Sequence, residues 1–164
     1  MIGHTVDIGA VRPEVDADWT IGEVGSLACV SGPSLRISPD LFEEMVDHAR
    51  AEAPNECCGM IATQNGAAVR VHRMVNAAAS PLRYVIEPQE QYQVQTAIED
   101  DGLDLGAIYH SHTRSEPLPS QTDINLAFYP DAVYVIVGLA GEEPDVRAWT
   151  IRDGAVAEAK LLVS

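Results

Sequence analysis

Two apolar, β-rich runs, 57–63 and 68–75, flank the dipeptide Asn65-Gly66 near the middle of the chain. Asn-Gly readily adopts the positive φ angles of a tight two-residue turn, which makes it one of the strongest local signals for a β-hairpin. The two runs are therefore expected to form neighbouring antiparallel strands. No other local feature restricts the fold as much, because it fixes both the turn and the direction of two strands.

Helical segments lie before and after this hairpin. Ser38-Pro39 is typical of an N-cap and first helical residue, and Pro54-Asn55 ends that helix, while Pro88 opens a second helix that Gly102 closes. The other expected elements are strands at 34–37, 83–87, 103–112, 132–140, 146–152 and 155–163, the last two turned by Asp153-Gly154, and a short helix at 120–128. The sum is an α/β (α+β) fold with a mixed β-sheet flanked by two to three helices.

Residues 1–32 differ from the rest of the chain. They carry five acidic side chains against one arginine and show no sustained periodicity. We interpret 1–32 as a flexible or loosely docked acidic arm, although an early start codon would leave the same pattern. Residues 33–164 are expected to form one domain, a size that buries a core without disulfide bonds.

The formal net charge of the chain is −15, from 25 acidic and 10 basic side chains. This charge disfavours binding to the phosphate backbone of nucleic acids or to anionic lipid. Three cysteines without a CxxC pair indicate neither a disulfide framework nor a cysteine-based zinc site, and they suit a reducing compartment. No apolar run approaches the roughly 20 residues of a membrane span, and the N-terminal residues lack the pattern of a signal peptide. We therefore expect a cytoplasmic protein that binds neither nucleic acid nor membrane.

His110 and His112 lie two residues apart on the expected strand 103–112. Residues i and i+2 of a strand share one face, so the two imidazoles can bind one ion. Asp123 follows in the first turn of the short helix, after a loop that can return to the end of the strand. Two histidines, one aspartate and a position left for water are the ligand set of a catalytic zinc site. Other interpretations stay open, because the histidines can be surface decoration or a satisfied hydrogen-bonded pair, and Ser120 with Asp123 can form a capping box alone.

Glu56 stands at the junction of the first helix and the strand 57–63, at the head of an apolar stretch. A carboxylate that only adds solubility is unusual there. Hydrolysis by a metal-bound water also needs a base that lies near the metal without being a ligand. Glu56 is our candidate for this base, although a glutamate at a strand end can equally be a surface residue.

Together these residues resemble the JAMM motif of the MPN-domain metalloproteases, E…HS(T)HxxxxxxxSxxD. The positions are filled in order and with the same inner spacing by Glu56, His110-Ser111-His112, Ser120 and Asp123. The resemblance covers about 34–164. It includes a Pro-x-Glu-x-Cys-Gly approach to the glutamate and the segment Asn76…Ser80-Pro81…Tyr84. It implies a curved, mixed sheet of the MPN, cytidine-deaminase-like architecture.

The resemblance further implies one Zn²⁺ per chain, held by His110, His112 and Asp123, with Glu56 activating the bound water and Ser120 helping to stabilise the oxyanion. Such enzymes hydrolyse peptide or isopeptide bonds, commonly at the C-terminal tail of a ubiquitin-like protein. The short segment after Asp123 leaves no room for the clamp insertion of longer eukaryotic members. The chain therefore looks most similar to small bacterial members, which act on ubiquitin-like sulfur-carrier proteins ending in Gly-Gly, for example to release cysteine in cysteine biosynthesis. Such a carrier is the implied partner, and a homodimer stays open.

Three other interpretations remain. A RadC-like protein, associated with DNA repair, has a similar pattern but typically reads His-Asn-His-Pro, whereas this chain reads His-Ser-His-Thr at 110–113. Phage tail-assembly peptidases usually carry a second, cell-wall-cleaving domain. A non-catalytic MPN scaffold subunit usually lacks the metal ligands that are present here. A metal-dependent hydrolase needs no cysteine nucleophile, so we expect Cys57 and Cys58 to be buried and structural.

Overall fold

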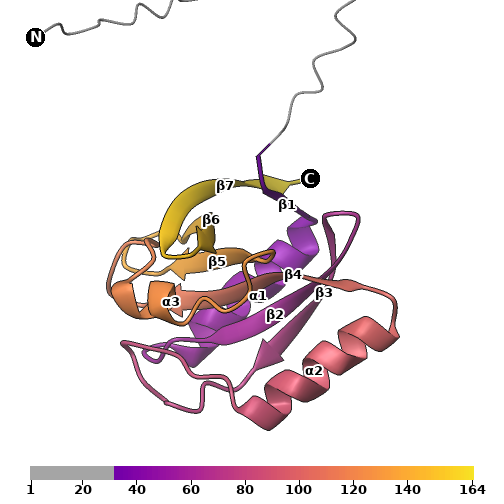
Figure 1. Cartoon of the computed structure of the whole chain (residues 1–164). Helices are drawn as coiled ribbons and strands as arrows, with labels where there is room; N and C mark the ends of the chain where they lie inside the picture. The colour runs from indigo at the N-terminus through magenta and orange to yellow at the C-terminus, as the bar shows by residue number, and fades with distance from the viewer. Residues whose placement is uncertain (1–31) are drawn as a thin grey trace, which may run out of the picture. The chain divides into compact units, whose positions relative to one another are not determined.

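The computed structural model describes residues 32–164, so the arm predicted for 1–32 lies, except for Gly32, outside the described residues. Within 32–164, seven strands form one mixed sheet in the order β1-β3-β2-β4-β5-β6-β7 (Figure 1). Their bounds are β1 Ser34–Ile37, β2 Cys58–Gln64, β3 Ala67–Met74, β4 Asp104–His112, β5 Val133–Gly138, β6 Asp145–Arg152 and β7 Ala155–Val163. Because β1 pairs in parallel with both β3 and β7, the curved sheet closes on itself.

Both predicted hairpins are confirmed. Strands β2 and β3 are antiparallel around Asn65 and Gly66, whose φ angles are 51° and 75°. Strands β6 and β7 are antiparallel around Asp153 and Gly154, whose φ angles are 49° and 78°. Positive φ at both central residues is what a two-residue turn between twisted strands requires, and Asn, Asp and Gly adopt it at least cost.

The helices begin and end close to the predicted residues. Helix α1 spans Pro39–Glu52, and the Ser38 hydroxyl at its N-cap accepts a hydrogen bond from the Leu41 amide at 3.4 Å. Helix α2 spans Pro88–Asp100 and is followed by Gly102 with a φ of 69°. Helix α3 spans Gln121–Asn125. Across the described residues, we find no helix with the length and apolarity that crossing a membrane requires.

The central strand β4 separates two differently covered faces of the sheet. Tyr109 packs in the core cluster that contains buried residues of α1. Ile108 packs in a cluster bordered by residues of α3 and of the segment after it, and the adjoining cluster contains Ile98 of α2. In Figure 1, α1 accordingly lies behind the sheet, with α2 and α3 nearer the viewer. Because side chains alternate along a strand, His110 and His112 face the α2 and α3 side together with Ile108.

The strand predicted at 83–87 is wrong. The segment makes a single bridge, between Asn76 and Ile86. The Asn76 side chain replaces the missing neighbour strand, since its amide nitrogen donates to the Arg83 carbonyl at 3.1 Å and its amide oxygen accepts from the Val85 amide at 3.0 Å. Extended backbone is therefore held here by one polar side chain, which satisfies the hydrogen bonds that a ladder would otherwise supply.

The helix predicted at 120–128 is shorter than expected and ends at Asn125, with Leu126 as its C-cap. Pro130 disfavours helical backbone at the residue before it. The Tyr129 amide instead donates to the Tyr134 hydroxyl at 3.0 Å, which leads the chain into β5. Pro130 and the contact with Tyr134 thus favour a non-helical path after Asn125.

Candidate metal centre

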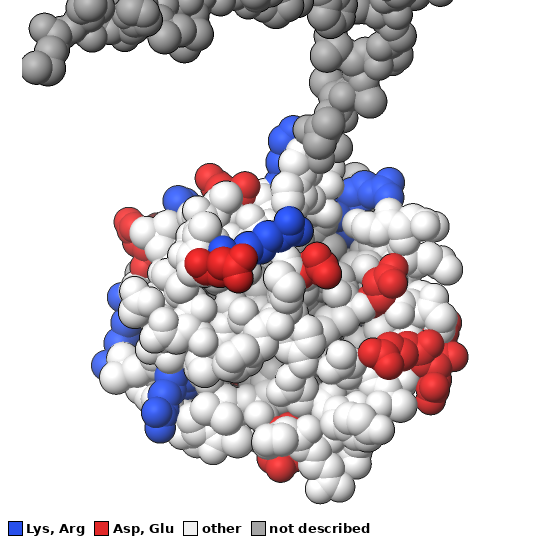
Figure 2. Space-filling model, viewed as in Figure 1, with Lys and Arg blue, Asp and Glu red and all other residues white. Residues whose placement is uncertain are grey.

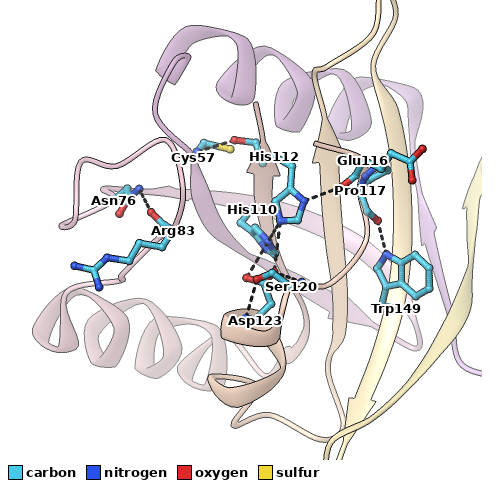
Figure 3. A network of polar contacts seen from close by, with 11 residues as sticks. Cys57, Asn76, Arg83, His110, His112, Glu116, Pro117, Ser120, Asp123 and Trp149 are labelled. Atoms are coloured by element: carbon cyan, nitrogen blue, oxygen red, sulfur yellow. Dashed lines mark hydrogen bonds and ion pairs between the residues drawn. The ribbon is translucent and has the colours of Figure 1, made fainter. Parts of the chain in front are cut away.

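Two histidines meet at the end of β4. His110 and His112 both lie in the sheet's buried surface, with 0% and 6% of their side chains exposed. Their Nε2 atoms are 3.2 Å apart (Figure 3). The prediction that both rings project from one face of a strand is confirmed. Their burial excludes surface decoration, while a separation of 3.2 Å is also that of a hydrogen-bonded pair.

Asp123 reaches the histidines from the first turn of α3. Its Oδ1 lies 3.3 Å from His110 Nε2, and its Oδ2 lies 3.4 Å from His112 Nε2. The predicted capping box is also present, because the Ser120 hydroxyl accepts from the Asp123 amide at 3.2 Å while Asp123 Oδ2 accepts from the Ser120 amide at 2.7 Å. One helix start therefore supplies both the cap and a carboxylate that faces two imidazoles.

These three side chains form a buried group fit for a metal ion. Four ligands placed tetrahedrally at 2.0–2.2 Å from a zinc ion lie about 3.3–3.6 Å from one another. The two Nε2 atoms are 3.2 Å apart, and Asp123 lies 3.3 Å from His110 through Oδ1 and 3.4 Å from His112 through Oδ2, which is close to that spacing. Burial lowers the pKa of His110, so its imidazole is neutral at pH 7, the form that binds metals. Burial alone would raise the pKa of Asp123, but hydrogen bonds from His110, His112 and Ser120 outweigh it and hold the carboxyl ionised.

A hydrogen bond at its other ring nitrogen, Nδ1, fixes the orientation of His112. Its Nδ1 donates to the Glu116 carbonyl at 2.8 Å, so Nε2 faces the candidate site and carries the lone pair there whenever the imidazole is neutral. The loop that carries this carbonyl is anchored in turn, because Trp149 Nε1 donates to the Pro117 carbonyl at 2.9 Å (Figure 3). A carbonyl held in this way selects the imidazole tautomer that a metal site needs.

His110 is held differently, by stacking. The ring of Tyr84 lies 4.6 Å from the ring of His110, with 26° between their planes. The other ring nitrogen of His110, Nδ1, is buried without a protein partner in the described residues. Stacking by Tyr84 therefore takes the place of the hydrogen bond that usually orients a ligating histidine.

Glu56 lies next to this group. Cys58 of β2 pairs with His110 of β4, and the Ser111 amide donates to the Cys57 carbonyl at 3.2 Å. The two strands are antiparallel, so the next residues in this register, Glu56 and His112, also lie beside each other. Glu56 is 5% exposed, which makes it a buried carboxyl and not a surface one. Burial raises its pKa to about 7, while the charges of His112 and Asp123 lower and raise it respectively. A carboxyl with a pKa near the working pH is well suited to accept and return a proton.

The backbone of Glu56 is fixed on both sides. Its amide donates to the Ser80 carbonyl at 2.9 Å, and its carbonyl accepts from the Asn76 side chain at 2.9 Å. The next amide along the chain, that of Cys57, donates to the Ser111 hydroxyl at 2.8 Å. Because Asn76 also binds the backbone on either side of Tyr84, one buried amide joins the segment of Glu56 to the ring that stacks on His110.

Sequence reasoning gave no role to Asn76, Tyr84 or Ser111. The motif segment Asn76…Tyr84 was a signal that these residues matter, and Ser111 stands between the two histidines, but their partners are distant in sequence. The Ser120 hydroxyl donates to Asp123 Oδ2 at 2.6 Å. The structure thus brings together all five predicted site residues, and their chemical roles are proposals.

Cys57 and Cys58 are both fully buried, and they belong to different core clusters on opposite faces of the sheet. Burial, as the largest cause, raises the pKa of each thiol to about 12. Both are therefore protonated at neutral pH, and neither is a competent nucleophile.

Comparison with known proteins gives consistent matches. A model of the prokaryotic homologs of the JAB domain matches residues 38–152. The CysO-cysteine peptidase of Mycobacterium tuberculosis is 42% identical over 132 residues, which are 79% of this chain and 90% of that protein. A probable TtuB-protein conjugate cleaving protease of Thermus thermophilus is 35% identical over 143 residues, 87% of this chain and 93% of that protein.

Among solved structures, protein DSY2949 from Desulfitobacterium hafniense has a TM-score of 0.71 and 28% identity, over 79% of this chain and 92% of that one. The match extends across most of both chains. The fold class predicted from the sequence, a mixed α+β sheet with two to three helices, is confirmed.

Proposed function

The chain belongs to the JAMM/MPN metalloprotease family, in its prokaryotic JAB branch, and we propose that it hydrolyses the bond after the C-terminal Gly-Gly of a ubiquitin-like sulfur-carrier protein. The resemblance stated from the motif is thereby confirmed at the level of the family. The observation that carries the proposal is the buried group of His110, His112 and Asp123 with Glu56 beside it.

His110, His112 and Asp123 would hold one zinc ion at this site. When bound, the ion would supply Lewis acidity that lowers the pKa of a water molecule and polarises the scissile carbonyl. Glu56 accepts the proton of the attacking water as its oxygen bonds to the carbonyl carbon. As the C–N bond breaks, the same carboxyl returns that proton to the leaving amine. No covalent acyl-enzyme is formed, in agreement with two buried, protonated cysteines.

Two kinds of leaving group are represented among the relatives, an amino acid in the CysO-cysteine peptidase and a protein in the probable TtuB-protein conjugate cleaving protease. We propose a carrier-cysteine adduct for this chain, on the strength of the 42% identity. The short segment between α3 and β5, residues 126–132, supports this choice because it has no room for a domain-sized clamp on a second protein. The proposed location is the cytoplasm, where sulfur carriers work.

The proposal is tested by incubating the zinc-loaded protein with a ubiquitin-like carrier extended by cysteine after Gly-Gly. Intact mass spectrometry is expected to show loss of the cysteine residue and return of the free Gly-Gly carboxylate. A carrier with Ala-Ala before the cysteine is the matched control and should stay intact, since side chains there would not fit a narrow extended cleft. Equal cleavage of both carriers and of casein would contradict the assigned substrate class, while zinc binding without any cleavage would favour the non-catalytic scaffold.

Ser120 is proposed both to cap α3 and to donate to the developing oxyanion. A Ser120→Gly variant should lose only a few tenths of a kcal/mol of cap stability but roughly 10²–10³-fold in kcat, the usual cost of removing one oxyanion donor. The hydroxyl gives its one proton to Asp123 Oδ2 in this structure, so it must turn toward the substrate to act as an oxyanion donor. Because the variant also loses this contact with a metal-ligand candidate, kcat must be measured at saturating zinc. Near-normal kcat in a zinc-loaded glycine variant would leave Ser120 as a cap alone.

A further inference from the structure

A cavity of about 200 Å³ lies beside the candidate metal centre, between α2, β4 and the segment after α3. Its walls include Tyr84, Val85, Ile108, Leu126, Phe128 and Tyr129. None of the residues that line it carries a charge. Figure 2 shows a broad area free of Lys, Arg, Asp and Glu on the face of the molecule that carries α2 and α3.

The cavity adjoins the candidate metal centre through Tyr84 and Ile108. Ile108 precedes His110 by two residues on the same face of β4, so their Cα atoms are about 7 Å apart along the strand. Tyr84 lines the cavity and stacks on the ring of His110. An extended chain that is bound at the metal centre and runs along β4 toward Ile108 would therefore pass over this hollow.

The lining has few free hydrogen-bonding groups to offer. The Gln91 side chain donates to the Tyr129 hydroxyl, which itself donates to Gln95 at 3.1 Å, and the Tyr134 hydroxyl accepts from the Tyr129 amide. At the rim, three apolar side chains remain largely exposed, namely Phe128 at 73%, Leu126 at 44% and Val85 at 41%. The Gln91 side chain and the hydroxyls of Tyr129 and Tyr134 thus have protein partners, while apolar surface at the rim is exposed.

Size decides what the hollow can hold. Cofactors and drug-sized ligands occupy pockets of about 300–1,000 Å³, whereas an apolar cavity of about 150 Å³ is enough for benzene. A volume of about 200 Å³ suits one apolar side chain. The open rim and the position beside the metal centre point to a side chain carried by the substrate.

We propose that this cavity is a specificity subsite for an apolar side chain of the carrier's C-terminal tail, at the residue immediately before Gly-Gly. The inference rests on the proposed function. An extended chain advances about 3.3–3.6 Å per residue, so the third residue before the scissile bond lies about 7 Å from the first, the distance from His110 to Ile108. The two glycines at the first and second positions carry no side chain that could enter the hollow.

The first arm of the test varies the substrate. Carriers ending in Leu-Gly-Gly-Cys and Glu-Gly-Gly-Cys are compared by kcat/KM. The leucine carrier is expected to be cleaved roughly 10- to 100-fold better, the range for burying one large apolar side chain instead of exposing it. Equal values for the two carriers would overturn the subsite and leave the proposed function intact. Cleavage of neither carrier would overturn both.

The second arm varies the enzyme. Phe128→Arg places a cation at the rim, and because Phe128 is 73% exposed the variant should fold. It is expected to lower kcat/KM for the leucine carrier and raise it for the glutamate carrier, so that the ratio falls at least about tenfold. Tyr92→Arg is the matched control, an aromatic residue of α2 that is 72% exposed and does not line the cavity, and its ratio should be unchanged.

Two outcomes of this arm would overturn the subsite. One is an unchanged leucine-to-glutamate ratio in Phe128→Arg with normal zinc content. The other is a fall in molecular mass from dimer to monomer without a change in the ratio, which would assign the surface to a second copy of the chain. Light scattering on the wild-type and variant proteins separates these results.

Discussion

A His110→Ala variant is expected to retain little zinc after dialysis and to lose at least about 10³-fold in kcat/KM, since a catalytic metal supplies several kcal/mol of transition-state stabilisation. His110 is fully buried, and its Nε2 is within 3.3 Å of both other ligand candidates. Zinc content is measured by atomic absorption. Thermal denaturation gives a second readout, because a chelator should lower the Tm of the wild-type protein, whose folded state alone binds the ion, and should not change that of the variant.

The matched control is His72→Ala. His72 is a partly buried histidine of β3 that is outside the group of possible ligands, so its variant should keep about one zinc per chain and respond to the chelator like the wild type. If His110→Ala also kept stoichiometric zinc, the ion would have to bind elsewhere and the assigned site would be wrong. Separating zinc content from folding in this way prevents a merely unstable variant from being mistaken for a missing ligand.

Much of the fold could be predicted because its signals are local. Asn65-Gly66 and Asp153-Gly154 adopt positive φ angles because of their own residue types. A helix begins at Ser38-Pro39 because the Ser38 hydroxyl caps it and the proline ring fixes φ. The period of two along β4 likewise placed both histidines on one face before any tertiary contact was known. Each of these features depends on residues within one turn or one strand.

The features that sequence reasoning missed depend on contacts between distant segments. Asn76 holds the 83–85 backbone where a strand was predicted, and the same side chain binds the Glu56 carbonyl 20 residues away. Closure of the sheet through β1 needs β7, which lies at the other end of the domain. No local propensity carries such information, because the energy comes from a partner that the segment meets only after folding.

The candidate site was likewise predictable only in its local features. The ligand types and the HxH spacing are visible in the sequence, but the placement of Asp123 depends on a loop whose path is set by the contact of Trp149 with the Pro117 carbonyl. The cap role of Ser120 was predictable from the Ser-x-x-Asp pattern. The cavity beside the site was not, because its walls come from α2, β4 and the segment after α3.

A Glu56→Gln variant is expected to keep its zinc and to lose roughly 10²–10⁴-fold in kcat, the contribution of a positioned general base. The amide preserves the shape of the side chain but cannot accept the proton of water. The structure favours this residue because Glu56 is a buried carboxyl whose backbone is fixed by Ser80 and Asn76, beside His112. Zinc content and kcat on the Gly-Gly-Cys carrier are measured on the same preparation, so that loss of the metal and loss of the base can be distinguished.

Two further variants test whether the effect belongs to the position of this carboxyl. Glu116→Gln changes an exposed side chain whose backbone carbonyl alone contacts His112, so it should leave kcat unchanged. Glu56→Asp keeps an acid but withdraws it by one methylene, and a misplacement of about 1 Å can cost about 10²-fold, so its kcat should lie between those of the wild type and Glu56→Gln. If Glu56→Gln retained wild-type kcat with full zinc, proton transfer would have to be assigned to another group. The buried acid beside the three ligand candidates would then be structural, and the catalytic proposal would lose its base.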